Sequence, residues 1–264
     1  MEPILKLDKV VKRFGGLVAV NELSFEMQPR EIHALIGPNG SGKTTTINLI
    51  DGFYEVNAGK ILFDGKEIQN KPTHQISAEG IGRTFQNLNM FSSLTVEENL
   101  LIPGQNKSKI GFGRYLFDFN GTKNEEKRLR EEAAVVMNDL GLTQYKDTVV
   151  KSLPYGRQKI VELARVIMLK PKLILLDEPA AGLNPSERAE FVDMVLRVYD
   201  SGVDILMIEH NMDVVMNISH RITVMNFGKK IAEGKPEEIR TNPEVISAYL
   251  GDKYRVGTEG AADA

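Results

Sequence analysis

GPNGSGKTT, which spans residues 37–45, decides the fold class because it matches the phosphate-loop pattern G-x-x-x-x-G-K-[ST]. It follows an apolar segment that ends at Ile36 and precedes a helix that we expect to begin near Lys43. Glycines permit a tight turn whose backbone N–H groups point inward around phosphate oxygens, and the following helix adds the positive end of its dipole. We therefore predict a nucleotide site in which Lys43 holds the β- and γ-phosphates and the Thr44 hydroxyl ligates Mg²⁺. A chance glycine turn is the alternative, and the position between a strand and a helix disfavours it.

LILLDEP, residues 173–179, supplies the second half of the predicted site. A continuous apolar run that ends in an acid is typical of a buried strand, and it presents Asp177 at the carboxyl end, where open α/β sheets bind ligands. Asp177 fits a carboxylate on the Mg²⁺ side, and Glu178 could polarise a water for in-line attack on the γ-phosphate. Alone, the pattern is explained equally well by an acidic helix cap. Beside a phosphate loop, the nucleotide site is favoured.

Two kinds of sheet are predicted around these motifs. Residues 4–36 and 60–68 alternate like antiparallel strands, with Asp64-Gly65 as a hairpin turn. Later in the chain, apolar runs alternate with helical patterns, which predicts a buried parallel sheet with helices on its faces. These runs are LILLD at 173–177, DILMIE at 204–209 and RITVM at 221–225, with helices expected after Pro185 and Asn211.

Helical patterns dominate residues 95–169. The clearest is residues 124–140, where apolar residues recur at helical spacing and Gly141 marks the stop. Residues 101–122 are rich in Gly, Lys and Phe and fit neither period, so we expect an irregular surface insert there. The tail, residues 251–264, has no apolar period and is expected to be disordered.

Composition excludes several classes of function. The net charge of −3 gives no reason to expect binding to nucleic acid, and the absence of cysteine excludes disulfides and thiolate metal sites. The N-terminal sequence MEPILKLDKV lacks the apolar centre of a signal peptide. No apolar run approaches the roughly 18–20 residues that span a bilayer. If a membrane is involved, another subunit is expected to supply the spans.

Three isolated residues are candidates whose alternatives stay open. Gln86, between the sheet half and the helical half, could reach Mg²⁺ or the attacking water, or could be a solvated loop residue. His210, at the end of DILMIE, could touch the γ-phosphate or simply begin a helix. Phe14, in KRFGG, could stack on adenine or belong to the core.

Together these motifs resemble those of the ATP-binding subunit of ABC transporters, over residues 3 to about 250 and in that family's order. The resemblance implies a Walker A loop made of Gly37, Pro38, Asn39, Gly40, Ser41, Gly42, Lys43, Thr44 and Thr45. It implies that Phe14 stacks on adenine, that Gln86 is the Q-loop glutamine on Mg²⁺, that Asp177 is the Walker B aspartate, that Glu178 is the catalytic glutamate and that His210 is the switch histidine. The signature motif falls on Leu153, Pro154, Tyr155, Gly156 and Arg157, and the D-loop on residues 181–185, AGLNP.

The resemblance also implies an α/β fold, with a RecA-like P-loop NTPase core and an antiparallel β subdomain in residues 1–86 and 170–250. An inserted α-helical subdomain would occupy residues 87–169. In this family two ATP-binding subunits close head to tail on ATP, and each signature motif completes the other subunit's Walker site. The implied partners are a second ATP-binding subunit, identical or paralogous, membrane permease subunits and, indirectly, an extracytoplasmic substrate-binding protein. The implied location is the cytoplasmic face of the cell membrane, as a peripheral subunit.

Two positions depart from the family pattern. Asn184 stands in the D-loop where Asp is common, so a contact across the dimer would be an uncharged hydrogen bond. Pro154 stands where the family has the signature serine, and proline offers neither a hydroxyl nor an N–H. The N–H groups of Tyr155 and Gly156 would still project from the helix N-terminus toward a phosphate. We therefore expect the composite site completed by this signature to be weakened rather than abolished.

Within the family, the chain looks most like the larger ATPase of branched-chain amino-acid importers. The features are Tyr-Gly in the signature, the insert at 101–122, AAGLNP after Walker B, and NPEVISAYLG at 242–251. Urea and short-amide importers and the ATPase that extracts lipopolysaccharide share much of this pattern. A soluble ABC ATPase of the iron–sulfur assembly type is a rival of another class, while small-molecule kinases are disfavoured by the signature together with Gln86 and His210.

Overall fold

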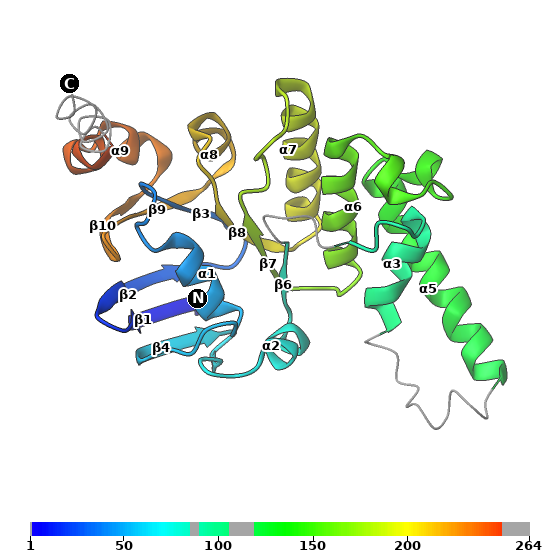
Figure 1. The fold of residues 1–264 in the computed structure, drawn as a ribbon, viewed down its shortest axis with the longest axis horizontal. Coiled ribbons are helices and arrows are strands. Elements are labelled where there is room, and N and C mark those ends of the chain that lie inside the picture. The colour runs from blue at the N-terminus through cyan, green and yellow to red at the C-terminus, as the bar shows by residue number, and fades with distance from the viewer. Residues whose placement is uncertain (1, 85–89, 106–118, 250–264) are drawn as a thin grey trace, which may run out of the picture.

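The computed structural model describes residues 2–84, 90–105 and 119–249. Gln86, the centre of the predicted insert and the predicted tail lie outside these ranges. The described chain forms two sheets and a group of helices (Figure 1). The predicted helical region and the later β–α alternation are both present.

A small antiparallel sheet follows the N-terminus, with the strand order β2-β1-β4-β5. Its strands are β1 (Leu5–Phe14), β2 (Leu17–Met27), β4 (Ala58–Phe63) and β5 (Lys66–Glu67). The central strand β1 pairs with β2 and β4 on its two sides, so that Leu5 faces Met27 in one ladder and Phe63 in the other. Asp64 and Gly65 form the predicted hairpin turn with φ of 49° and 73°, since Phe63 and Lys66 on either side are paired.

A six-stranded sheet has the order β10-β9-β3-β8-β7-β6. Its strands are β3 (Ile32–Ile36), β6 (Ile81–Arg83), β7 (Leu173–Asp177), β8 (Asp204–Ile208), β9 (Arg221–Asn226) and β10 (Lys229–Gly234). All neighbours are parallel except β9 and β10, which form an antiparallel hairpin. Grouping residues 32–36 with the antiparallel strands was wrong, because β3 lies between β8 and β9 and all five of its residues are buried.

The helices cover the larger sheet and extend from one end of it (Figure 1). They are α1 (Lys43–Ile50), α2 (Thr73–Glu79), α3 (Val96–Gln105), α5 (Phe119–Asp139), α6 (Tyr155–Ile167), α7 (Pro185–Asp200), α8 (Met212–Ile218) and α9 (Pro236–Thr241). Short 3₁₀ turns occupy Thr143–Tyr145 and Val150–Ser152, and residues 243–249 are also helical.

The ends of the predicted irregular insert are helical, which corrects its boundaries. Helix α3 continues to Gln105, with Leu101 packed against the hydrophobic core, and α5 already begins at Phe119. The predicted stop at Gly141 is confirmed. Gly141 has φ of 64°, and the N–H of Leu142 donates to the carbonyl of Met137 at 2.7 Å, which closes the end of α5.

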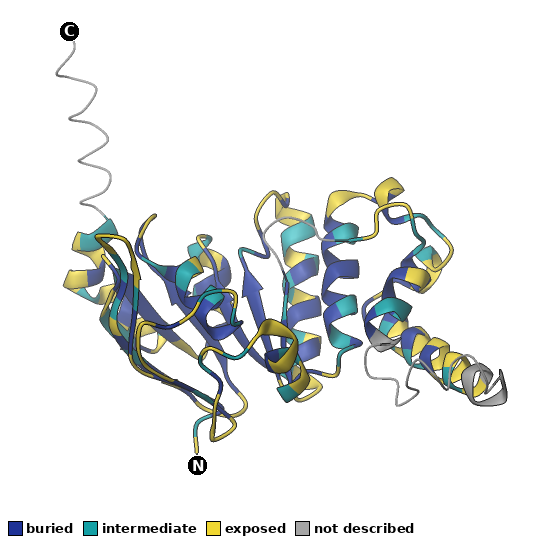
Figure 2. Ribbon diagram, turned by 60° about the horizontal axis from the view of Figure 1, so that its bottom comes forward, coloured by how far each residue is buried: buried dark blue, intermediate teal, exposed yellow. Residues whose placement is uncertain are grey.

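The larger sheet separates two hydrophobic clusters, because alternate residues of each strand point to opposite faces. On β7, Ile174 and Leu176 belong to the cluster shared with α6 and α7, whereas Leu173 and Leu175 belong to the cluster shared with α1 and the antiparallel sheet. Figure 2 shows the strands of the larger sheet largely in dark blue, the colour of buried residues. Burial on both faces explains the uninterrupted apolar run of LILLD.

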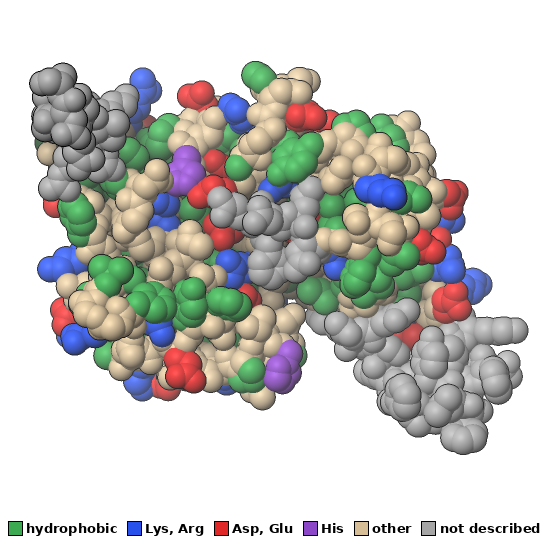
Figure 3. Space-filling model, viewed as in Figure 1, with side chains coloured by type: hydrophobic (Ala, Val, Ile, Leu, Met, Phe, Trp, Pro, Cys, Tyr) green, Lys and Arg blue, Asp and Glu red, His purple; other side chains and the backbone are tan. Residues whose placement is uncertain are grey.

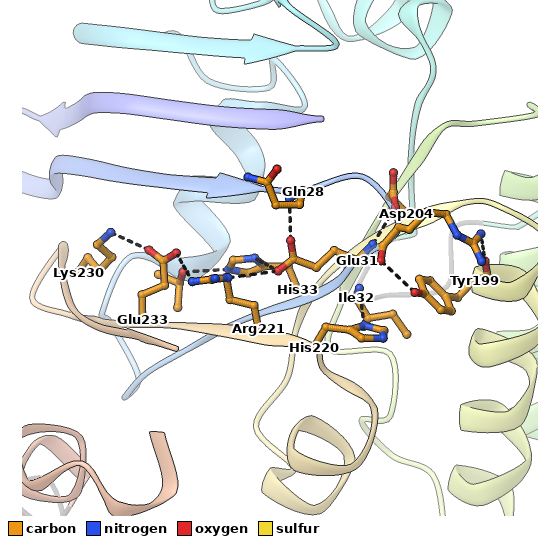
Figure 4. A network of polar contacts seen from close by, with 12 residues as sticks. Gln28, Glu31, Ile32, His33, Tyr199, Asp204, His220, Arg221, Lys230 and Glu233 are labelled. Atoms are coloured by element: carbon orange, nitrogen blue, oxygen red, sulfur yellow. Dashed lines mark hydrogen bonds and ion pairs between the residues drawn. The ribbon is translucent and has the colours of Figure 1, made fainter. Parts of the chain in front are cut away.

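A polar network ties together the amino ends of β3, β8 and β9 (Figure 4). Glu31 accepts a hydrogen bond from the N–H of Gln28 at 2.6 Å and lies 3.2 Å from Nδ1 of His33, whose Nε2 is 2.9 Å from the Thr223 hydroxyl. Asp204 accepts from the N–H of Glu31 at 3.0 Å. Because ligands of such sheets bind at the opposite, carboxyl ends of the strands, we interpret this network as structural.

Candidate functional site: a nucleotide cleft

A cleft of about 590 Å³ opens where the carboxyl ends of β3, β7 and β8 meet. Nine of the residues singled out in the sequence line it: Phe14, Asn39, Gly40, Gly42, Lys43, Thr44, Thr45, Glu178 and His210. The rest of the lining consists of residues that no sequence motif indicated, namely Leu17, Val18, Ala19, Phe227 and Gly228. Segments from both sheets therefore form one cavity.

The phosphate loop has the tight geometry that its glycines predict. Gly37 and Gly42 have φ of 150° and 104°. A Cβ on Gly37 would lie 2.1 Å from the carbonyl oxygen of Met225, and one on Gly42 would lie 2.5 Å from that of Ala19. The loop therefore packs directly against the β9 and β2 backbones, and a side chain at either glycine would force them apart.

Lys43 is held inside the loop. Its Nζ donates hydrogen bonds to the carbonyls of Gly37 at 2.8 Å and Pro38 at 2.9 Å, and Ser41 Oγ lies 3.5 Å away. Burial lowers the pKa of the Lys43 ammonium, and the carboxylates of Glu178 and Asp177 act in the opposite direction. The loop thus holds one cation at the position where a polyphosphate would bind.

Asp177 is the last residue of β7 and lies behind the cleft. Its two carboxylate oxygens differ in their surroundings. Oδ2 accepts a hydrogen bond from Nη2 of Arg83 at 3.1 Å, while the buried Oδ1 has no partner in the described part of the chain. Arg83 Nη1 also contacts Asn48 at 2.7 Å and Asp51 at 3.2 Å. Burial raises the pKa of the Asp177 carboxyl, and the charge of Arg83 opposes the rise. The sequence analysis did not identify Arg83, because nothing in IGRT, residues 81–84, indicates that the arginine pairs with a carboxylate at the end of another strand.

The donor set fits Mg²⁺ bound together with a polyphosphate. Asp177 Oδ1, which has no hydrogen-bond partner among the described residues, and the Thr44 hydroxyl are hard oxygen donors, which Mg²⁺ prefers. Among the described residues no group of three or more His, Cys, Asp or Glu side chains is placed to hold a metal.

Glu178 and His210 meet in the cleft. Oε1 of Glu178 and Nε2 of His210 are 2.5 Å apart, and the N–H of Glu178 donates to the carbonyl of Ile208 at 2.9 Å. Glu178 has φ of 50°, a left-handed conformation that is uncommon for a non-glycine residue. The loop after β7 therefore turns the side chain of Glu178 toward His210, which lies two residues after the end of β8.

Glu209, which the sequence analysis did not single out, holds these two loops together. Its buried carboxylate accepts hydrogen bonds from the N–H groups of Ala180 at 2.7 Å, His210 at 3.0 Å and Asn211 at 3.1 Å. The sequence signal for Glu209 is an apolar run that ends in an acid, a pattern that DILMIE shares with LILLD.

Phe14 lines the cleft and is in contact with a second aromatic ring outside the lining. Phe14 is 41% exposed and meets Tyr54 edge to face with ring centroids 5.1 Å apart, while Lys12 Nζ lies 5.0 Å from the Phe14 ring centre. The exposed ring excludes the core alternative for Phe14. Figure 3 shows hydrophobic side chains gathered in a band over the antiparallel strands. An exposed, braced aromatic ring is suited to stacking on a base.

The signature residues lie outside the lining of this cleft. Leu153 is buried, and Pro154 is the N-cap of α6 rather than a residue of its first turn, with φ −53° and ψ 149°. The first backbone bond of the helix runs from the N–H of Gln158 to the carbonyl of Pro154, at 3.1 Å. The N–H groups of Tyr155, Gly156 and Arg157 therefore have no acceptor within the helix, and Pro154 provides no side-chain cap for them.

The signature instead packs against the D-loop and α7 of the same chain. A Cβ on Gly182 would lie 3.1 Å from the Tyr155 ring, and one on Gly156 would meet Glu187 at 3.0 Å. Arg157 pairs with Glu190 at 2.6 Å. Asn184 caps α7 by accepting from the N–H of Glu187 at 3.0 Å, and the carboxylate of Glu187 accepts from the N–H of Asn184 at 3.1 Å.

Comparisons with known proteins agree with this arrangement. The ABC transporter family profile matches residues 20–181, and a profile described as branched-chain amino acid ATP-binding cassette transporter matches residues 229–255. The high-affinity branched-chain amino acid transport ATP-binding protein BraF of Pseudomonas aeruginosa is 41% identical, covering 95% of this chain and 98% of its own. The protein of the same description from Escherichia coli K12, LivG, is 40% identical, covering 95% and 99%.

A solved structure, the ADP conformation of an ATP-binding cassette of an ABC transporter, is 34% identical and covers 95% of this chain and 100% of its own, with a TM-score of 0.83. Its sheets and helices correspond to those described above over nearly the whole chain. The chain therefore belongs to the ABC transporter family, as one of its ATP-binding, ATP-hydrolysing subunits.

Proposed function

We propose that this chain hydrolyses ATP to drive the import of branched-chain amino acids through separate membrane permease subunits. The observation that carries the enzymatic part is the contact of 2.5 Å between Glu178 and His210 in the cleft that Lys43 and Thr44 also line. The choice of substrate is supported by BraF and LivG, which are described as branched-chain amino acid transport proteins. Iron–sulfur assembly and lipopolysaccharide extraction are not favoured by these relatives.

ATP is held at both ends of the cleft. The Phe14 ring stacks on adenine, and the backbone N–H groups of residues 37–45 with the Lys43 ammonium bind the phosphates. Thr44, Asp177 and, outside the described residues, Gln86 would hold Mg²⁺, which supplies charge neutralisation between the β- and γ-phosphates.

Hydrolysis requires a water in line with the bond between the γ-phosphorus and the β–γ bridging oxygen. Glu178 accepts a proton from that water while the water oxygen attacks the γ-phosphorus. The bond between the γ-phosphorus and the bridging oxygen breaks, and ADP leaves with its electron pair. His210 contacts Glu178 and lines the same cleft as Lys43 and Thr44. Its contact with Glu178 supports a role in orienting the carboxylate and sensing the phosphate.

The second half of the active site comes from another ATP-binding subunit. The signature residues are outside the cleft, but the N–H groups of Tyr155 and Gly156 at the start of α6 have no acceptor among the described residues and are suited to a phosphate of the partner's ATP. In this arrangement residues 1–86 and 170–250 act as the ATP-binding core, and residues 87–169 as the helical signature subdomain. Asn184 would meet the partner through an uncharged hydrogen bond.

Membrane attachment would depend on the permease subunits. In the ranges that the structure covers, no helix is long and apolar enough to cross a bilayer. We propose that the subunit sits peripherally at the cytoplasmic face, with the permeases and an extracytoplasmic binding protein selecting the amino acid.

The test uses the full chain purified with its permease subunits in liposomes that contain the binding protein. We expect leucine uptake and phosphate release that both require ATP, and both should fall by at least about 100-fold in Glu178→Gln. A matched control is Glu67→Gln, which alters an exposed acid that lies on β5 outside the cleft. ATP hydrolysis without leucine uptake would contradict the substrate, and co-purification with soluble partners alone would favour the assembly-type ATPase.

A further inference from the structure

We propose that Phe227 forms a second apolar wall of the nucleoside end of the cleft and contacts the base or ribose of bound ATP. The proposal rests on the proposed nucleotide site, since it needs the phosphates to occupy the loop at residues 37–45. It adds a nucleoside contact from the turn between β9 and β10.

The lining of the cleft divides into two kinds of surface. The phosphate loop, Glu178 and His210 provide polar groups, whereas its exposed large hydrophobic side chains are Phe14, Leu17 and Phe227, with exposures of 41%, 67% and 70%. A polyphosphate gains nothing from apolar side chains, but a base and its sugar do. Phe227 therefore fits the nucleoside part of the ligand.

The backbone at Phe227 is unusual for an aromatic residue. Phe227 and Gly228 form a two-residue turn between the paired Asn226 and Lys229, with φ of 46° and 78°. Positive φ at both positions is the type I′ arrangement, which favours Asn-Gly or Asp-Gly because a bulky side chain is strained there. The other hairpin of this kind uses the favoured pair, Asp64-Gly65.

Packing within the described chain does not compensate for this strain, since 70% of Phe227 is exposed. A strained and exposed aromatic residue that lines a ligand cleft is better explained by the ligand than by the fold.

The turn is anchored to the phosphate loop. The N–H of Gly228 donates to the carbonyl of Ser41 at 2.9 Å, and the carbonyl of Gly228 accepts from the N–H of Asn21 at 2.8 Å. A Cβ on Gly228 would lie 2.9 Å from the Ala19 carbonyl oxygen. These contacts fix the backbone next to Phe227 relative to the loop, so the ring is presented at a set place along a nucleotide whose phosphates that loop binds.

The first test compares Phe227→Asn with the wild-type full chain by calorimetric titration with Mg²⁺ and either ADP or inorganic tripolyphosphate. We expect ADP binding to weaken about tenfold, the order expected for one lost base–aromatic contact, with tripolyphosphate binding unchanged. Because Asn suits a type I′ turn, the melting temperature should stay equal or rise. Asp64→Asn, in the equivalent turn outside the cleft, is the matched control.

Equal ADP affinity in Phe227→Asn and wild type would overturn the proposal. So would equal weakening of ADP and tripolyphosphate, because Phe227 would then act through the Ser41 contact. A wild-type chain that binds neither ligand would instead refute the proposed nucleotide site.

The second test uses the absence of tryptophan from the chain. Phe227→Trp introduces a single indole, whose emission should change with ADP and not with tripolyphosphate. Val135→Trp, on the exposed surface of α5, should respond to neither. An indole at 227 that does not respond to ADP would contradict direct contact.

Discussion

Replacing Pro154 with serine should increase ATP turnover at the composite site that this signature completes. Pro154 is exposed and is the N-cap of α6, with the extended backbone that serine also adopts at this position. A serine hydroxyl there can accept from an unbonded N–H of the first turn and still donate its proton to a phosphate of the partner's ATP. Proline can do neither.

The two consequences differ in size. The new cap stabilises the chain by about 1 kcal/mol, while removing proline makes the unfolded chain more flexible and takes back about 0.4–1 kcal/mol, so the melting temperature should barely change. A hydrogen bond to a charged group is worth about 1.5–3 kcal/mol. At about 1.4 kcal/mol per factor of ten, ATP affinity or turnover at that site should rise by roughly 10- to 100-fold.

The assay measures phosphate release against ATP concentration by the assembled transporter, together with thermal unfolding of the isolated chain. Pro236→Ser, at the first residue of α9 and outside the cleft, is the matched control. Turnover and half-saturating ATP within twofold of wild type would refute the reasoning, because the missing hydroxyl would then not limit the site.

Further predictions concern Glu178, Arg83 and Glu31. Glu178→Gln should trap an ATP-bound dimer on gel filtration with ATP and Mg²⁺, and a purely monomeric elution would contradict its role as the base. Arg83→Met should lower the free energy of unfolding by about 3–5 kcal/mol in urea, because two buried carboxylates lose their partner; Lys172→Met, which breaks an exposed pair, should lower it by less than about 1 kcal/mol, and equal losses would refute the difference. Burial raises the pKa of Glu31, but hydrogen bonds from His33 and Gln28 and the charges of His33 and Arg221 together bring it below its usual 4.5. The resulting stability is present above pH 4.5 and is lost as the pH falls through the lowered pKa, so the advantage of wild type over Glu31→Gln in urea should shrink from pH 6 to pH 3; a constant difference would contradict this.

Local patterns predicted the elements on which the nucleotide site is built. The glycines of residues 37–45, the apolar run of LILLD and the Asp64-Gly65 turn each have a conformational requirement that neighbouring residues satisfy by themselves. The places of Lys43, Glu178 and His210 at one edge then follow from strands that are parallel. For this reason the motifs and their common position at the carboxyl edge of the sheet could be inferred from the sequence.

Contacts between distant segments could not be inferred in this way. Arg83 meets Asp177 across 94 residues, Glu209 joins two loops, and β3 pairs in parallel although its alternation resembled that of its antiparallel neighbours. Phe227 lines the cleft because its turn is hydrogen-bonded to the phosphate loop from the far end of the chain.

The sequence by itself thus determined the phosphate loop, the carboxylates, the family and the order of the elements, because these depend on residue type and short-range spacing. The tertiary structure alone decided which oxygen of Asp177 has no partner in the described chain and which residues line the cleft. It also decided that the signature packs against the D-loop of its own chain. Those features depend on packing between segments that are remote in the chain, and periodicity carries no information about such packing.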